Sequence, residues 1–187
     1  MKNLVKKIEA EGFVPQLWVG FTNETHITEV MKEHPDIVIS DETDDSWCGK
    51  YFLDPTHPYV KDVYIPKFLE QLKQWGLQCI KWDLLGETHT ALEKYHNRLY
   101  DPEMSSTEIM RQTMEYVRKT LGENVYICQC GAPGENELRL GADVFDAMRI
   151  GRDLWHWEDF RNQMLYKLCS HYPLHNVMLY CDPDTLI

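Results

Sequence analysis

Two kinds of segment alternate along the chain. Some are short runs of apolar residues, and others are longer runs in which apolar residues recur with helical periodicity. The short apolar runs predict strands at residues 13–21, 78–85, 124–130, 143–151 and 176–180. The amphipathic runs predict helices at residues 2–11, 26–34, 59–75, 105–121 and 157–171. Strands and helices that alternate at this spacing indicate right-handed βαβ units and therefore a parallel sheet.

The segments between these runs have the character of turns and loops. Residues 36–45 hold a small apolar run followed by a carboxylate-rich loop, and the two prolines within 53–58 predict a turn. Residues 86–103 predict a long polar loop that carries His89, His96 and Arg98. Loops of this length are often functional.

Each predicted strand ends in side chains that can support chemistry. In the run 78–85, Lys81 and Asp83 share one face with Cys79, because side chains alternate along a strand. A Lys and an Asp inside a parallel sheet are costly unless they are paired or used. The other strand ends carry Trp18, Cys128 with Cys130, Arg149 with Gly151 and Asp153, and Asp182 with Asp184. In a (β/α)8 barrel these carboxyl ends would meet in one active site.

Composition narrows the class of protein. The 187 residues suggest one domain, residues 1–187, or part of a larger one, and an apolar fraction of 43% is enough for a core. A net charge of −11 without a basic patch makes nucleic acid or an anionic membrane a poor partner. The sequence shows no signal peptide and no transmembrane segment, which leaves the compartment open. Six cysteines without C-x-x-C spacing predict mostly reduced, buried thiols.

Carboxylates on different strands, together with a Lys, an Arg and a Trp, suit glycoside hydrolysis. That reaction needs a carboxylate nucleophile and a carboxylic acid on either side of a sugar. Lys and Arg can hold hydroxyl groups, and indole rings stack on the C–H surfaces of sugars. The expected partner is a small carbohydrate, with no cofactor and no metal.

Four motifs occur in an order that resembles one enzyme family. They are Ile80-Lys81-Trp82-Asp83, then Cys130-Gly131-Ala132-Pro133, then the run 146–153, and finally Asp182-Pro183-Asp184. Together they resemble the melibiase-like α-galactosidases, the retaining clan that groups glycoside hydrolase families 27 and 36. The resemblance extends from Gly12 to Leu186 and implies a (β/α)8 TIM barrel.

The resemblance implies a double displacement by two aspartates. Asp83 corresponds to the nucleophile that forms a covalent glycosyl intermediate, and Asp153 to the general acid and then base. Lys81 and Arg149 would hold sugar hydroxyl groups near the nucleophile.

The resemblance also implies the residues that surround the sugar. Cys130 and Gly131 would border its 2-position, and Trp18 would pack against it. Trp155, two residues after Asp153, belongs to the expected substrate-binding set, and Asp184 would brace the site.

The sequence also departs from this family. No run of acidic residues that would bind the distal hydroxyl groups precedes Trp18, and Asp44-Asp45-Ser46-Trp47 lies in the wrong order to replace it. About five β/α units are predicted, so about three of the eight strands are lacking. We therefore expect an incomplete barrel that is completed by other parts of a longer chain or in another way, with a homo-oligomer as a further possibility.

Structural roles compete with these functional ones. Lys81 and Asp83 could form a salt bridge at a strand end, Asp153 could cap the helix at 157–171, and Arg149 could belong to a structural ion pair. Trp18 could be a core residue, and Cys128 and Cys130 could be inert core thiols. Two other functions also stay open: a non-catalytic carbohydrate-binding protein, and a metal-dependent barrel hydrolase that uses His57, His89, His96, His156 or His175.

Overall fold

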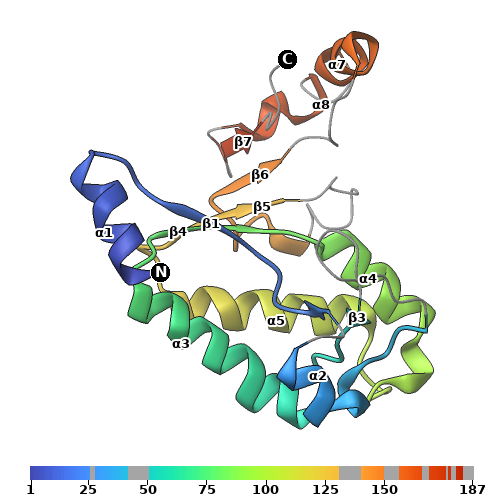
Figure 1. Cartoon of the computed structure of the whole chain (residues 1–187). Coiled ribbons are helices and arrows are strands. Elements are labelled where there is room, and N and C mark those ends of the chain that lie inside the picture. The colour runs from blue at the N-terminus through green and yellow to red at the C-terminus, as the bar shows by residue number, and fades with distance from the viewer. Residues whose placement is uncertain are drawn as a thin grey trace.

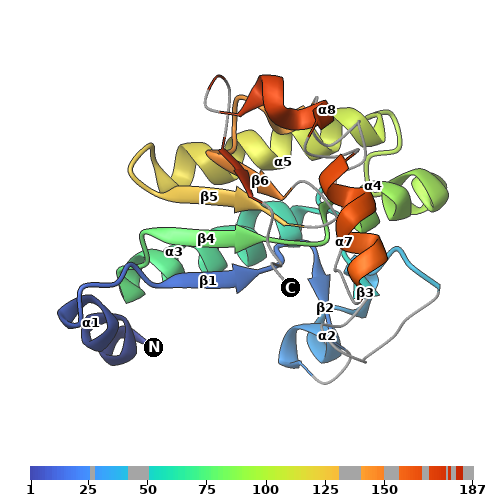
Figure 2. The same cartoon turned by 90° about the horizontal axis from the view of Figure 1, so that it is seen from above.

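The computed structural model of the chain describes residues 1–25, 28–41, 51–130, 140–149, 156–165, 169–175, 177 and 180–182. Its main sheet is fully parallel, and its five strands lie in the order β1-β4-β5-β6-β7. The strands are β1 (Gln16–Val19), β4 (Cys79–Trp82), β5 (Tyr126–Gln129), β6 (Ala147–Arg149) and β7 (Tyr180–Asp182). Seen from above, β1, β4 and β5 run side by side in one direction (Figure 2). The predicted parallel sheet is confirmed.

Helices connect the strands and cover one face of the sheet. The helices are α1 (Lys2–Ala10), α2 (Glu29–Glu33), α3 (Ile65–Trp75), α4 (Leu85–Lys94), α5 (Ser106–Leu121), α7 (Trp157–Gln163) and α8 (Cys169–His171). Figure 1 shows α3 and α5 side by side beneath the sheet, with α7 and α8 beyond the β7 edge. Among the described helices, none combines the length and the apolar character that a membrane crossing requires.

The face of the sheet toward α3 and α5 holds the core. Ile80, Trp82 and Ile127 are at most 1% exposed there, and Phe21 packs edge-on against Trp82 at 4.8 Å between ring centroids. The α3 helix ends at Gly76, whose positive φ of 80° suits a residue without a side chain. The opposite face of the sheet is more open, as the exposed fractions of 40% for both Trp18 and Tyr126 show. Lys81 and Asp83 lie on this second face by the alternation of β4.

The chain from β1 to α3 contains an element that the sequence did not indicate. Strands β2 (Asn23–Glu24) and β3 (Tyr51–Phe52) pair antiparallel, and Val38 forms an isolated bridge to Leu53. Residues 42–50, which hold most of the predicted carboxylate-rich loop, lie outside the described residues.

The predicted loop at 86–103 is wrong, because the segment begins with helix α4 and continues into a short 3-10 turn at His96–Arg98. The buried positions Leu85, Thr88, Ala91 and Leu92 follow helical spacing, but two of the buried side chains on this face, Thr88 and His89, are polar. The polar composition therefore hid an amphipathic helix.

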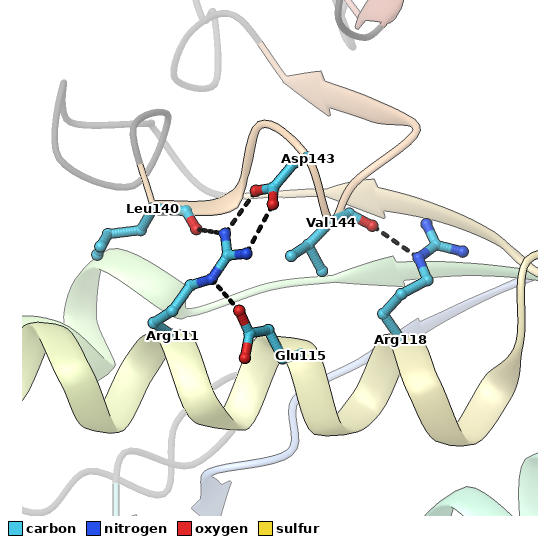
Figure 3. A network of polar contacts seen from close by, with 6 residues as sticks. All are labelled: Arg111, Glu115, Arg118, Leu140, Asp143 and Val144. Atoms are coloured by element: carbon cyan, nitrogen blue, oxygen red, sulfur yellow. Dashed lines mark hydrogen bonds and ion pairs between the residues drawn. The ribbon is translucent and has the colours of Figure 1, made fainter.

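The predicted strand at 143–151 begins only at Ala147, because the preceding residues form a turn that is fixed to helix α5. Arg111 donates to the carbonyl of Leu140 at 2.8 Å and to both carboxylate oxygens of Asp143 (Figure 3). The guanidinium of Arg111 lowers the pKa of Asp143 by hydrogen bonding. Arg118, which lies seven residues after Arg111 on the same helix, donates to the carbonyl of Val144 at 2.7 Å (Figure 3).

Arg118 also reaches the two neighbouring strands. Its Nη2 donates to Asp146 Oδ2 at 2.6 Å, and its Nη1 donates to the carbonyl of Val125 at 2.7 Å. The same Asp146 oxygen accepts from the backbone N–H of Ile127 at 2.8 Å. Arg118 therefore fixes β5 and β6 relative to α5, and with them the side chains at the strand ends.

Candidate active site

Asp83 lies directly after β4, at the carboxyl end of the sheet. Its backbone N–H donates to the carbonyl of Val19 at 2.9 Å, which continues the pairing of β4 with β1. Trp18 Nε1 donates to Asp83 Oδ2 at 2.8 Å, and the backbone N–H of Leu84 donates to Oδ1 at 2.8 Å. The residue is only 7% exposed. Donors on both oxygens compensate a buried carboxylate for lost hydration and fix its orientation.

The geometry of Leu84 explains one of these donors. Leu84 has φ 64° and ψ 21°, a left-handed conformation that is unusual for a residue with a branched side chain. This turn ends β4 and starts α4 in a single step. It also turns the backbone N–H of Leu84 back toward Asp83.

The strand register sets the remaining side chains in two rows on the open face. In the first row, Trp18 is paired with Lys81, and Lys81 with Cys128. The second row lies one step nearer the carboxyl ends, where Arg149 is paired with Asp182. Arg149 is 7% exposed, and its Nη1 lies 3.9 Å from the sulfur of Cys130.

The pKa of the Cys128 thiol reflects the burial and the charges in these two rows. Burial raises the pKa of its thiol to about 12, and the negative charge of Asp182 adds to the increase while Lys81 opposes it. The sulfur lies 3.8 Å from Asp182 Oδ2, although these residues stand on β5 and β7, two strands apart. In a flat sheet those backbones would be about 9–10 Å apart.

Ala147 on β6 makes this approach possible. It is paired with Cys128 on one side and Tyr180 on the other, and it is 1% exposed. Its small side chain leaves room for Cys128 and Asp182 to meet over it. The contact indicates that the sheet curves around this face, as the wall of a barrel does.

The β1 side of the site is closed by contacts beyond the strand ends. Thr22 and Thr88 share a buried hydrogen bond of 2.9 Å, which ties the end of β1 to α4. Gly20 has no side chain to displace Asn23, whose Oδ1 would lie 2.0 Å from a Cβ at that position. Asn23 is 8% exposed and therefore packs over the end of β1.

The structure places some predicted site residues and leaves others outside its description. It brings Trp18, Lys81, Asp83, Cys130 and Arg149 to the same end of the sheet on one face. Gly131, Asp153 and Trp155, and also Asp184, lie outside the described residues. The indole of Trp18 differs from the expected sugar platform in one respect, because its N–H is engaged with Asp83. The donor role of Leu84 and the position of Asn23 were missed, since neither follows from side-chain alternation.

The cysteines that the structure describes are mostly buried thiols, as expected, and Cys48 lies outside the described residues. Cys79, Cys128, Cys130 and Cys181 are buried and outside any disulfide, whereas Cys169 is exposed. Burial also raises the pKa of Cys79 and Cys181.

The histidines proposed as metal ligands lie in separate environments. His57 approaches Asp36 at 3.4 Å, and His89 lies 3.9 Å from Glu93. His96 contacts the carbonyl of Met104 at 2.8 Å, and His175 accepts from the backbone N–H of Cys181 at 3.1 Å. Within the described ranges, no three His, Cys, Asp or Glu side chains are grouped so that they could hold a metal ion.

Several solved structures that are similar to this chain are glycosidases. The chain is similar to TtGalA, an α-galactosidase from Thermus thermophilus in complex with p-nitrophenyl α-D-galactopyranoside, with a TM-score of 0.72 and 20% identity over 100% of this chain. It is also similar to a GH27 β-L-arabinopyranosidase from Geobacillus stearothermophilus, with a TM-score of 0.65 and 17% identity over 98% of the chain. No family model matches the sequence.

A third similar structure is the glycoside hydrolase domain of PelA from Pseudomonas aeruginosa, with a TM-score of 0.63 and 11% identity over 92% of this chain and 68% of that one. The chain spans only 40% of the α-galactosidase and 41% of the arabinopyranosidase. At these identities the likeness defines the fold. The chain has the fold of part of a (β/α) barrel, and this fold is shared with the α-galactosidase and the GH27 arabinopyranosidase.

Proposed function

We propose that the protein is a retaining glycoside hydrolase that removes terminal α-galactosyl groups or a closely related sugar. The observation that carries this proposal is the placement of Asp83, a buried carboxylate at a strand end with a donor on each oxygen. Lys81 and Arg149 supply positive charge from the same face. The fold supports the same class of reaction.

In the proposed reaction, one oxygen of Asp83 attacks the anomeric carbon, and the bond to the leaving group breaks. Asp153 gives its proton to the departing oxygen, so that a covalent glycosyl-enzyme and a free alcohol result. Asp153 then takes a proton from water, which attacks the anomeric carbon and releases Asp83. Configuration is retained, because the anomeric carbon is inverted twice.

The surrounding residues have supporting roles in this proposal. Lys81 and Arg149 hold sugar hydroxyl groups, and Cys130 with Gly131 borders the 2-position. Trp155 contributes to the substrate-binding surface. Trp18 packs beside the sugar and, through its N–H, keeps Asp83 in the orientation for attack.

The choice of sugar follows from the similar structures. Two of them hold p-nitrophenyl α-D-galactopyranoside and stachyose, and a third is a β-L-arabinopyranosidase. α-D-Galactopyranosides and β-L-arabinopyranosides share their ring configuration and differ in the hydroxymethyl group. We therefore propose a galactose-configured substrate.

Turnover of an aryl α-galactoside tests the proposal. Asp83→Asn and Asp153→Asn should each abolish turnover, whereas Asp41→Asn, which removes only an exposed partner of Arg98, should retain it. Azide should rescue Asp83→Asn with the product inverted and Asp153→Asn with the product retained, because azide replaces a different group in each case. Normal rates in both variants would disprove the assignment.

A binding experiment separates catalysis from recognition. Because the chain spans 40% of the α-galactosidase that it resembles, calorimetry with galactose should accompany the assay. The expected result is that the protein both binds galactose and hydrolyses the aryl galactoside. Arg149→Ala should lose the galactose binding. Binding without hydrolysis would favour a non-catalytic carbohydrate-binding role.

A further inference from the structure

A separate cavity of about 510 Å³ lies between the amino-terminal ends of α3 and α5. Ile65 of α3 and Ile109 of α5, which are 3% and 2% exposed, form part of its lining. Its lining comes from α3, α5 and the segments before them, whereas Asp83 follows strand β4. Its volume falls within the range of sites that bind small molecules.

One wall of the cavity is fixed by a buried carboxylate. Asp54 is 2% exposed, and its Oδ1 accepts from the backbone N–H and the hydroxyl of Thr56 at 2.8 and 2.6 Å. Its Oδ2 accepts from the backbone N–H of Tyr100 at 2.6 Å, and the Thr56 hydroxyl oxygen accepts from the N–H of Asp101 at 3.1 Å. Thr56 and Asp101 line the cavity. Asp54 therefore joins two loops into one preorganised surface.

A π-helical turn forms a second wall. Residues Val60–Tyr64 make this turn before α3, and it carries Lys61 and Asp62 into the lining. Such turns are rare and occur frequently at functional sites. Both side chains are exposed, and neither forms a hydrogen bond or an ion pair with the described part of the chain.

The remaining wall is aromatic and polar. Tyr116 of α5 is 40% exposed at the cavity, and Gln112 lies one turn before it. The lining thus combines an accessible ring, an apolar floor, acceptors and donors. It holds one cation, Lys61, and two carboxylates, Asp62 and Asp101. This balance disfavours an anionic ligand such as a phosphate.

We propose that this cavity is a second saccharide-binding site, for a neutral pyranose or short oligosaccharide, distinct from the site around Asp83. Tyr116 stacks on the C–H face of the sugar ring, and the carboxylates of Asp62 and Asp101 accept from its hydroxyl groups. Lys61 and Gln112 donate to the hydroxyl oxygens. None of these residues belongs to the proposed catalytic set, so the site does not depend on hydrolysis.

Methyl NMR of the Asp83→Asn protein with labelled Ile and Met tests the proposal. Stachyose is the probe, and the Asp83→Asn variant is used so that the probe is not hydrolysed. The methyl resonances of Ile65, Ile109 and Met104 should change position as stachyose is added, until the site is saturated. Tyr116→Ala should weaken this binding roughly fivefold to tenfold, because it removes the aromatic contact. Tyr172→Ala, which removes an exposed tyrosine elsewhere, should leave it unchanged.

Three results would overturn the proposal: unchanged cavity methyl signals up to the solubility limit of stachyose, equal shifts with inorganic phosphate, or unchanged binding in Tyr116→Ala. If Tyr116→Ala fails to fold, Asp62→Asn at an exposed position decides the question, because unchanged binding there would also exclude the site. A protein without glycosidase activity could still bind stachyose in this cavity. Failure of the proposed hydrolase function and failure of the second binding site are therefore distinguishable.

Discussion

Trp18 and Asp83 meet through a single hydrogen bond between neighbouring strands. The indole supplies a donor to Asp83 Oδ2, while the backbone of Leu84 supplies one to Oδ1. If Asp83 is the nucleophile, this arrangement holds its carboxylate in one plane throughout the reaction. Trp18 would then act by positioning Asp83 as well as by contact with the sugar.

Substitution of Trp18 by Phe tests this role. The variant keeps an aromatic ring but loses the N–H, so kcat for an aryl α-galactoside should fall by about 10- to 100-fold. Because the loss of the N–H leaves Oδ2 of the buried Asp83 without this donor, Tm should fall moderately, and kcat is therefore compared well below the Tm of both variants. Trp75→Phe on α3, which covers the face of the sheet opposite Asp83, is the control and should retain normal kcat. Equal kcat in the two variants would contradict the positioning role.

The thiol of Cys128 provides a second prediction for a single residue. Its pKa of about 12 means that almost no thiolate is present near neutral pH, and its side chain is buried. We expect iodoacetamide to alkylate exposed Cys169 well before Cys128, as peptide mass spectrometry of a time course can show. Faster labelling of Cys128 would mean that the rows around it are open and differently charged.

At the level of single residues, the sequence predicted which side chains share a face but not how they bond. Alternation along β4 places Lys81 and Asp83 together without knowledge of the fold. The bond from Trp18 to Asp83 depends on the register between β1 and β4, which are separated by about 60 residues of chain and joined only by tertiary structure. The contact between Cys128 and Asp182 depends further on the curvature of the sheet.

Helix α5 is the element that holds the starts of β5 and β6 to the core. Its sequence signals were complete, with Ser105 as the cap that accepts from the backbone N–H of Glu108 at 3.2 Å. Helix α4 lacked such signals, because it starts from the left-handed turn at Leu84 without a side-chain cap. The antiparallel pair of β2 and β3 was hidden for another reason, since its strands are only two residues long and far apart in sequence.

Arg118→Met should show how strongly α5 holds β5 and β6. The variant loses hydrogen bonds to Val125, Val144 and Asp146 around a side chain that is 11% exposed. We expect a decrease of roughly 2–4 kcal/mol in the free energy of unfolding by urea. Lys119→Met changes the next residue, which is exposed, and should alter stability by less than about 0.5 kcal/mol. A similar small change for both variants would mean that the network contributes little.

Among the strands that the structure describes, β1 and β7 are the edges of the main sheet, and its centre at β4 and β5 is covered by α3 and α5. Alternating strands and helices were enough to predict that the strands are parallel, because βαβ units join parallel strands. The neighbours of the two edge strands were not predictable, since no pattern within a strand encodes its distant neighbours.

Hydrogen exchange followed by NMR tests this description of the sheet. Amide hydrogens of β4 and β5 should exchange at least about tenfold more slowly than those of β1 and β7, because central strands open only with the core. Uniform protection across all five strands would indicate that both edges are covered in solution, for example by another copy of the chain.

The left-handed backbone at Leu84 limits how this region of the chain can vary. Its side chain is 2% exposed, so a large apolar residue is favoured there, while its φ of 64° favours Gly, Asn or Asp. No single amino acid satisfies both demands. In a mutational library, this position should therefore tolerate fewer replacements than Leu85 or Leu92, which are buried leucines within α4, and β-branched residues should be the first to disappear from the functional pool.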